Sequence, residues 1–267
     1  MTLRELIRKT RSELSGENAD FEARQMVFSA CKTDATRLLL CDRQATDSEQ
    51  AAIDEFVKRR NAGEPLYYIL GKAEFYSIPL KVSSDTLIPR QDSELIVDLA
   101  LGYAKENPVK KACDLCSGSG AIGIAFSENS GVHTDCVELY DGAFSILSEN
   151  VKRFKNAFAV QADALKFDLS GYELITCNPP YIAQSERQML SKEVMNEPET
   201  ALFAPEGGLM FYRVISGNLK SGAHIIYEIG FSQAKSVCEI LLKSGFRDIK
   251  THKDLNGLDR AVEATKI

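Results

Sequence analysis

After residue 110 the chain alternates between short apolar segments and longer amphipathic segments with helical spacing. The apolar segments are nearly continuous, which is typical of strands buried on both faces of a mostly parallel sheet. Strands that alternate with helices predict an α/β fold with a doubly wound sheet. The last two strands are joined by a loop and not by a helix, so we expect one strand to run antiparallel. The seven expected strands lie at residues 111–115, 133–138, 157–161, 172–177, 223–228, 247–251 and 260–265.

Residues 1–72 lack this alternation and favour short helices. Two capping boxes mark helix starts, one formed by Thr2 with Glu5 and the other by Thr46 with Glu49. In such a box the hydroxyl accepts a hydrogen bond from a free backbone N–H of the first turn, and the glutamate binds the backbone N–H of the cap residue. We therefore predict a small helical bundle domain at the N-terminus.

Residues 73–85 alternate apolar and polar side chains and include Pro79, a pattern that predicts a β-hairpin or an edge strand. We expect this segment to connect the helical domain to an α/β domain at residues 86–267. The α/β domain opens with an amphipathic helix whose expected apolar face comprises Leu95, Ile96, Leu99 and Tyr103.

Composition narrows the class of protein. With 44% hydrophobic and 26% charged residues the chain is typical of globular proteins. It has neither a membrane-spanning apolar run nor the apolar stretch of a secretory signal, so we expect a cytoplasmic protein without membrane contact. Seven scattered cysteines include one CxxC pair, Cys113 and Cys116, with no partners for zinc, so no metal is expected. A net charge of −6 argues against duplex nucleic acid as a direct partner.

A glycine-rich turn follows the first expected strand of the sheet, at the position where ligands bind in such folds. Gly118 and Gly120 would let the backbone approach a ligand closely. Together with Gly123 they also match the dinucleotide fingerprint, and Glu138 could hold ribose hydroxyls in a nicotinamide enzyme or in an S-adenosylmethionine enzyme. This motif alone leaves both cofactors open.

The acids at the ends of the first two strands narrow the choice. Asp114 could face a methionine amino group and Glu138 a ribose, an arrangement that resembles the class I methyltransferases. Cys116 replaces the first glycine of their usual Asp-x-Gly-x-Gly-x-Gly pattern, and Asp163, followed by Ala164 where an aromatic is common, falls where this fold contacts adenine. The expected cofactor-binding residues are Asp114, Cys116, Ser117, Gly118, Ser119, Gly120, Glu138, Asp163, Ala164 and Asn178.

The fourth expected strand ends in Asn178-Pro179-Pro180-Tyr181. Two successive prolines remove two backbone donors and make the loop rigid. The Asn178 side-chain oxygen and the Pro179 carbonyl could accept both N–H bonds of an amide or adenine amino group and orient its nitrogen toward a methyl donor. Tyr181 could pack on the planar group. An ordinary turn is the alternative, but the position beside the glycine-rich loop favours these four residues as a catalytic motif.

Five segments of the chain together resemble the release factor glutamine methyltransferases, the PrmC/HemK family. Four of them are GEPLYYILGKAEFYSIPLKV, NPPYI, NEPETALFAPEGGLMFYRVI and DLNGLDRAVEA. The fifth, TLIPRQDSELIV, departs from the family because Gln91-Asp92-Ser93-Glu94 stands where Pro-Glu-Thr-Glu is more usual. The resemblance extends along nearly the whole chain.

This resemblance implies N5-methylation, with S-adenosyl-L-methionine, of the glutamine in the Gly-Gly-Gln loop of peptide chain release factors. It also implies that residues 1–72 bind the release factor and that Arg90 and Glu197 shape the substrate pocket, although a structural ion pair is the alternative for these two. We expect a monomer. Two other functions remain open: a DNA or RNA amino-group methyltransferase acting on an unpaired base, and a non-catalytic protein that binds release factors or ribosomes.

Overall fold

The computed structural model describes all 267 residues, which form two compact units, Met1–Gly71 and Lys72–Ile267. No helix of either unit has the length and the apolar character needed to cross a membrane.

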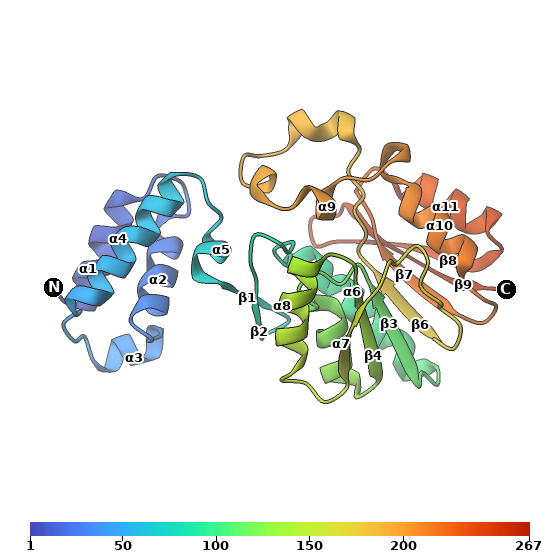
Figure 1. The fold of residues 1–267 in the computed structure, drawn as a ribbon, viewed down its shortest axis with the longest axis horizontal. Coiled ribbons are helices and arrows are strands. Elements are labelled where there is room, and N and C mark those ends of the chain that lie inside the picture. The colour runs from blue at the N-terminus through green and yellow to red at the C-terminus, as the bar shows by residue number, and fades with distance from the viewer. The chain divides into compact units, whose positions relative to one another are not determined.

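The first unit is entirely helical (Figure 1). Both predicted capping boxes are present, with Thr2 and Glu5 at the start of the first helix and Thr46 and Glu49 at the start of the fourth. Apolar side chains of the longer helices meet in a core of their own. The five helices are α1 (Leu3–Glu13), α2 (Ala19–Ala30), α3 (Ala35–Leu40), α4 (Asp47–Asn61) and α5 (Leu66–Leu70).

A β-hairpin opens the second unit. Strands β1 (Lys72–Phe75) and β2 (Ile78–Lys81) pair antiparallel around a turn at Tyr76 and Ser77, both of which have positive φ. A two-residue turn of this kind matches the twist of the strands that it joins. The buried Asn150 amide binds the Lys81 backbone at both its N–H and its carbonyl, and thereby anchors the hairpin to helix α8 (Asp141–Val151).

The main sheet has seven strands in the order β5-β4-β3-β6-β7-β9-β8. Strand β9 runs antiparallel to both of its neighbours, and the other six are parallel to one another. The predicted doubly wound sheet with one antiparallel strand is thus confirmed. The strands are β3 (Lys111–Leu115), β4 (His133–Glu138), β5 (Ala157–Gln161), β6 (Leu174–Cys177), β7 (His224–Glu228), β8 (Phe246–Lys253) and β9 (Asp259–Lys266).

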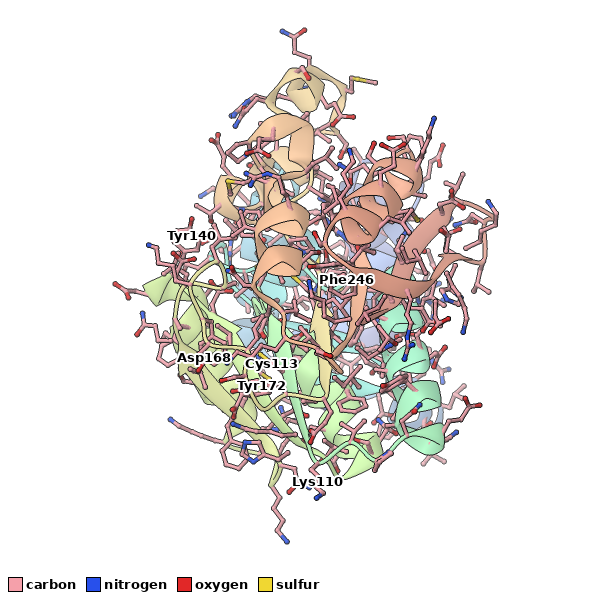
Figure 2. All side chains as sticks on the ribbon, turned by 90° about the vertical axis from the view of Figure 1, so that its right-hand side faces the viewer. Lys110, Cys113, Tyr140, Asp168, Tyr172 and Phe246 are labelled. Carbon is pink, nitrogen blue, oxygen red and sulfur yellow. The ribbon has the colours of Figure 1, made fainter.

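Helices cover both faces of this sheet because successive strand residues point to opposite sides. On β6, Leu174 packs toward α6 (Glu94–Glu106) and α7 (Ala121–Ser130), whereas Ile175 packs toward α10 (Met210–Asn218) and α11 (Ala234–Lys243). Figure 2 labels three side chains of the core on the α10 and α11 side of the sheet, Cys113, Tyr172 and Phe246. The remaining helical turns are α9 (Glu199–Leu202), η1 (Gln91–Ser93), η2 (Gln184–Met189), η3 (Val194–Asn196) and η4 (Glu206–Gly208).

Candidate active site

The carboxyl ends of β3, β4, β5 and β6 lie next to one another and open onto a cavity of about 470 Å³. Each strand contributes a residue to its wall, namely Ser117 after β3, Glu138 at the end of β4, Asp163 after β5 and Asn178 after β6. A cavity of this size at the carboxyl edge of a parallel sheet is where a small-molecule ligand is expected. Most of the predicted cofactor-binding residues therefore gather around one space.

The two glycines of the turn after β3 serve different purposes. Gly118 lines the cavity with φ +55°, and a β-carbon there would meet no atom within 4 Å, so its missing side chain leaves room for a ligand. Gly120 does not line the cavity. A β-carbon at Gly120 would come within 2.6 Å of Leu147 and 2.9 Å of Ile124, so this glycine allows close packing of α7 and α8.

Asp114 is buried beneath the turn. One of its carboxylate oxygens accepts from the Thr176 hydroxyl at 2.7 Å and the other from the Gly123 backbone N–H at 3.2 Å. Burial raises the pKa of Asp114 to about 6, against the opposing effect of these donors. A β-carbon on Gly123 would lie 2.9 Å from Cβ of Asp114, so the glycine is needed for the approach. A bound cation would favour the ionised carboxylate.

Glu138 organises two turns at once. Its Oε2 accepts from the Gly118 N–H at 2.9 Å, and its Oε1 accepts from the backbone N–H groups of Leu139 and Tyr140 at 2.8 and 3.0 Å. The carboxylate is therefore fixed at the cavity wall, where its free lone pairs are available to hydroxyl groups.

Asp163 and Ala164 both line the cavity. Asp163 also has local partners, since it accepts from the Leu165 N–H at 3.0 Å and pairs with Lys166 at 3.1 Å. The cavity wall also includes Leu139 and Tyr140, which were not among the predicted residues, and these two side chains are 45% and 48% exposed. The sequence pattern that could have predicted them is a pair of large apolar residues directly after Glu138, the acidic residue at the end of its strand. They are candidates for packing on a flat ring.

The Asn178–Tyr181 loop is divided by the structure. Asn178 and Pro180 line the cavity, whereas Pro179 and Tyr181 do not. No hydrogen bond within the protein occupies the Asn178 side chain, so its amide is available to a ligand. We expected Tyr181 to pack on the substrate group, but its hydroxyl instead donates to Glu228 at 3.4 Å because that buried carboxylate offers an acceptor behind the loop.

Arg90 lines the cavity, and Glu197 lies buried behind it. The two side chains form an ion pair, and the Ile88 N–H donates to the second carboxylate oxygen of Glu197 at 3.0 Å. Burial raises the pKa of Glu197 against the effect of Arg90. The ion pair with Glu197 thus holds Arg90 at the cavity wall. The same contact is a structural ion pair and shapes the cavity.

The residues present fit S-adenosylmethionine. A buried carboxylate at Asp114 matches an ammonium group, fixed lone pairs on Glu138 match ribose hydroxyls, and Leu139 with Tyr140 offers apolar area for adenine. Cys116, Ser117 and Ser119 complete the wall near the glycine-rich turn. The open space at Gly118 lies between these groups along the chain and leaves room for the body of the ligand.

Comparison with known proteins identifies two parts of the chain and its fold. A family model described as the PrmC N-terminal domain matches residues 5–71, and one described as the methyltransferase small domain matches residues 95–239. The crystal structure of the hMettl16 catalytic domain in complex with MAT2A 3'UTR hairpin 6 superposes with a TM-score of 0.59 at 17% identity, covering 83% of each chain. That likeness shows the shared fold.

Curated relatives are similar over most of their length. The release factor glutamine methyltransferase of Thermodesulfovibrio yellowstonii is 35% identical, covering 90% of this chain and 90% of that protein. The enzyme of the same name from Clostridium acetobutylicum is 32% identical, covering 100% and 99%. The one from Vibrio cholerae is 38% identical, covering 79% and 76%. The chain therefore belongs to the release factor glutamine methyltransferase family.

Proposed function

We propose that this enzyme transfers a methyl group from S-adenosylmethionine to the side-chain nitrogen of the glutamine in the Gly-Gly-Gln loop of a peptide chain release factor. The observation that supports this most directly is the Asn178 amide, which lines the cavity with no partner inside the protein and follows the strand next to the glycine-rich turn. Family membership supports the choice of a glutamine as the methyl acceptor.

S-adenosylmethionine supplies an electrophilic methyl group on a sulfonium. An amide nitrogen is a poor nucleophile because its lone pair is delocalised, so the enzyme's contribution is orientation. Asn178 Oδ1 accepts one N–H of the glutamine amide. The Pro179 carbonyl, which does not line the cavity, accepts the other once the release factor is bound. Phe203 and Phe211, which line the same cavity, provide apolar walls for the flat amide. No side chain is required as a strong base, since the proton can leave after the new bond has formed.

We also propose that residues 1–72 bind the release factor and that residues 73–85 connect them to a catalytic domain at residues 86–267. The helical unit contributes no residue to the cavity wall, and Leu39 and Leu40 on α3 are 77% and 83% exposed. A shortened chain that begins at Lys72 should keep its affinity for S-adenosylmethionine while its KM for the release factor rises. Loss of cofactor binding by a folded shortened chain would contradict this division.

The function is tested with methyl-labelled S-adenosylmethionine and three acceptors: purified release factor, the same factor with the Gly-Gly-Gln glutamine changed to alanine, and single-stranded nucleic acid. We expect label on the first acceptor alone. Label on nucleic acid but not on the factor would support the alternative amino-group methyltransferase. Cofactor binding without transfer to any acceptor would favour a non-catalytic protein that binds release factors or ribosomes.

A further inference from the structure

Gln233 holds the carbonyl of Tyr181. Its Nε2 donates to the Tyr181 carbonyl oxygen at 2.8 Å, and its Oε1 accepts from the Gly230 N–H at 3.0 Å. Gln233 precedes α11 directly, and its Oε1 is held by the turn that follows β7 and also accepts from the Tyr212 hydroxyl at 3.5 Å. The side chain thus connects the Asn178–Tyr181 loop to the neighbouring strand of the sheet.

Gly208 closes the other side of the same peptide. A β-carbon at Gly208 would lie 2.0 Å from the Tyr181 carbonyl oxygen and 2.8 Å from Nε2 of Gln233. No residue with a side chain fits there unless the loop moves. The Tyr181 carbonyl is therefore enclosed between a glycine and a single side-chain donor.

The proline content of the loop makes this contact important. Pro179 and Pro180 have no N–H, so between Asn178 and Tyr181 the backbone has few donors with which to fix its own position. Beyond the loop, Ile182 is held by backbone hydrogen bonds to Leu202 and Ala204. The loop is thus anchored on its far side at Ile182, and the Tyr181 carbonyl is its attachment next to the prolines.

We propose that Gln233 is a positioning residue for methyl transfer: by fixing the Tyr181 peptide it sets the direction in which Asn178 and the Pro179 carbonyl face the substrate amide. Gln233 does not line the cavity, so it would act on the reaction only through the loop. This inference rests on the proposed function, because it assigns Gln233 to the same site.

Two substitutions separate the hydrogen bond that Gln233 donates to Tyr181 from the two that its Oε1 accepts. Gln233→Glu keeps the side-chain length and the acceptor for Gly230 but replaces the donor to Tyr181 with an oxygen, and a carboxylate is tolerated at a helix N-terminus. Gln233→Met keeps a similar volume and removes all three hydrogen bonds. Lys235→Gln, an exposed substitution in the first turn of the same helix, is the matched control.

We expect both Gln233 variants to lower kcat by about tenfold to a hundredfold, since small errors in orientation are costly in such reactions. The KM for the release factor and the Kd for S-adenosylmethionine should stay within about twofold of wild type, and Lys235→Gln should match wild type throughout. A folded Gln233→Glu enzyme with wild-type kcat would overturn the proposal, even if Gln233→Met were slow. A parallel loss of cofactor affinity would also overturn it, because that result indicates general support of the cavity.

Amide hydrogen exchange provides a readout that does not depend on the substrate. Gln233→Glu should speed exchange at Tyr181 and Ile182 and leave the amides of β3 unchanged, with Lys235→Gln again as the control. If wild-type enzyme fails to methylate any release factor, the proposed function fails, but faster exchange at Tyr181 would still support the role of Gln233 in fixing the loop. Unchanged exchange in the loop would overturn that role whatever the substrate.

Discussion

The Tyr181 hydroxyl donates to Oε1 of Glu228 at 3.4 Å, and this hydrogen bond joins the loop after β6 to the end of the neighbouring strand β7. Glu228 is also bound by the Ser93 hydroxyl, and its backbone carbonyl accepts from Tyr212 at 2.9 Å. A carboxyl group is thus buried behind this loop. Glu228 does not itself line the cavity, but Ser93, which binds it, does. Because Glu228 is buried in the folded chain, its ionisation is coupled to folding.

We predict that Glu228 makes stability depend on pH. Burial raises the pKa of Glu228 from 4.5 to about 7, opposed by Ser93, Arg260 and Tyr181 and reinforced by Asp92. Between these two pKa values the folded state binds the proton more tightly than the unfolded state, so the stabilisation is present below about pH 4.5 and is lost as the pH rises through 7.

Glu228→Gln removes this titration, and its effect is best measured as a difference from wild type. The free energy of unfolding of the variant, relative to wild type, should rise by at most about 3 kcal/mol between pH 5 and pH 8, the limit set by the shift. Asp114 also has a raised pKa in this pH range, but its contribution to stability is the same in both proteins and cancels in the difference. Urea unfolding at both pH values measures the change, and parallel pH profiles for the two proteins would contradict the prediction.

A second prediction concerns cofactor binding and Asp114. Its pKa is about 6, raised by burial, and an ammonium group of the ligand would bind the ionised form. Affinity for S-adenosylmethionine should therefore fall as the pH drops below about 6, and Asp114→Asn should weaken binding at pH 8 by about tenfold or more while flattening the profile. Calorimetry across this range tests both effects. Equal affinity of wild type and variant at pH 8 would place the ammonium elsewhere.

The third prediction concerns Asn178. Asn178→Ala removes the free amide at the cavity wall but no hydrogen bond within the protein, so the fold should be unaffected while kcat falls by about a hundredfold or more. Thermal unfolding serves as the control for the fold, and labelled methyl transfer measures the rate. Near-normal turnover by a well-folded variant would exclude Asn178 as the group that orients the substrate nitrogen.

Much of the fold was predictable because buried parallel strands have an unambiguous pattern. Strand β3 matched its predicted bounds, and the antiparallel β9 followed from the absence of a helix between the last two strands. The predicted face of α6 was right but too narrow. Ile96 is buried, and Leu95, Leu99 and Tyr103 are partly buried and pack against the core. The helix also buries Val97 and Ala100, because it packs against both the sheet and α7.

The cavity wall was predictable where one strand end supplies the whole signal, as for Asp114, Glu138 and Asn178. It was not predictable where the partners lie far apart in the chain. Glu228 and Tyr181 are separated by 47 residues, and no local pattern relates them. Glu228 becomes buried behind the Tyr181 loop only because β6 pairs with β7.

The last prediction concerns Cys116, which occupies the first glycine position of the Asp-x-Gly-x-Gly-x-Gly pattern that this turn resembles. The structure gives the physical reason for that glycine, since Cys116 has φ +57°, a left-handed conformation that costs a residue with a side chain about 1 kcal/mol or more. Its side chain lines the cavity and also packs against the core between the sheet and α10. Cys116→Gly should leave the Kd for S-adenosylmethionine within about threefold, less than about 1 kcal/mol, because the thiol has the core as its partner.

Cys116→Ala is the matched control, because it loses the same sulfur while keeping the strained β-carbon. Cys116→Gly should therefore be more stable than Cys116→Ala, despite the greater freedom of glycine in the unfolded chain. If urea unfolding showed Cys116→Ala to be more stable than Cys116→Gly, residue 116 would not be strained. A tightening of cofactor binding by about tenfold in Cys116→Gly would show that the thiol crowds the ligand.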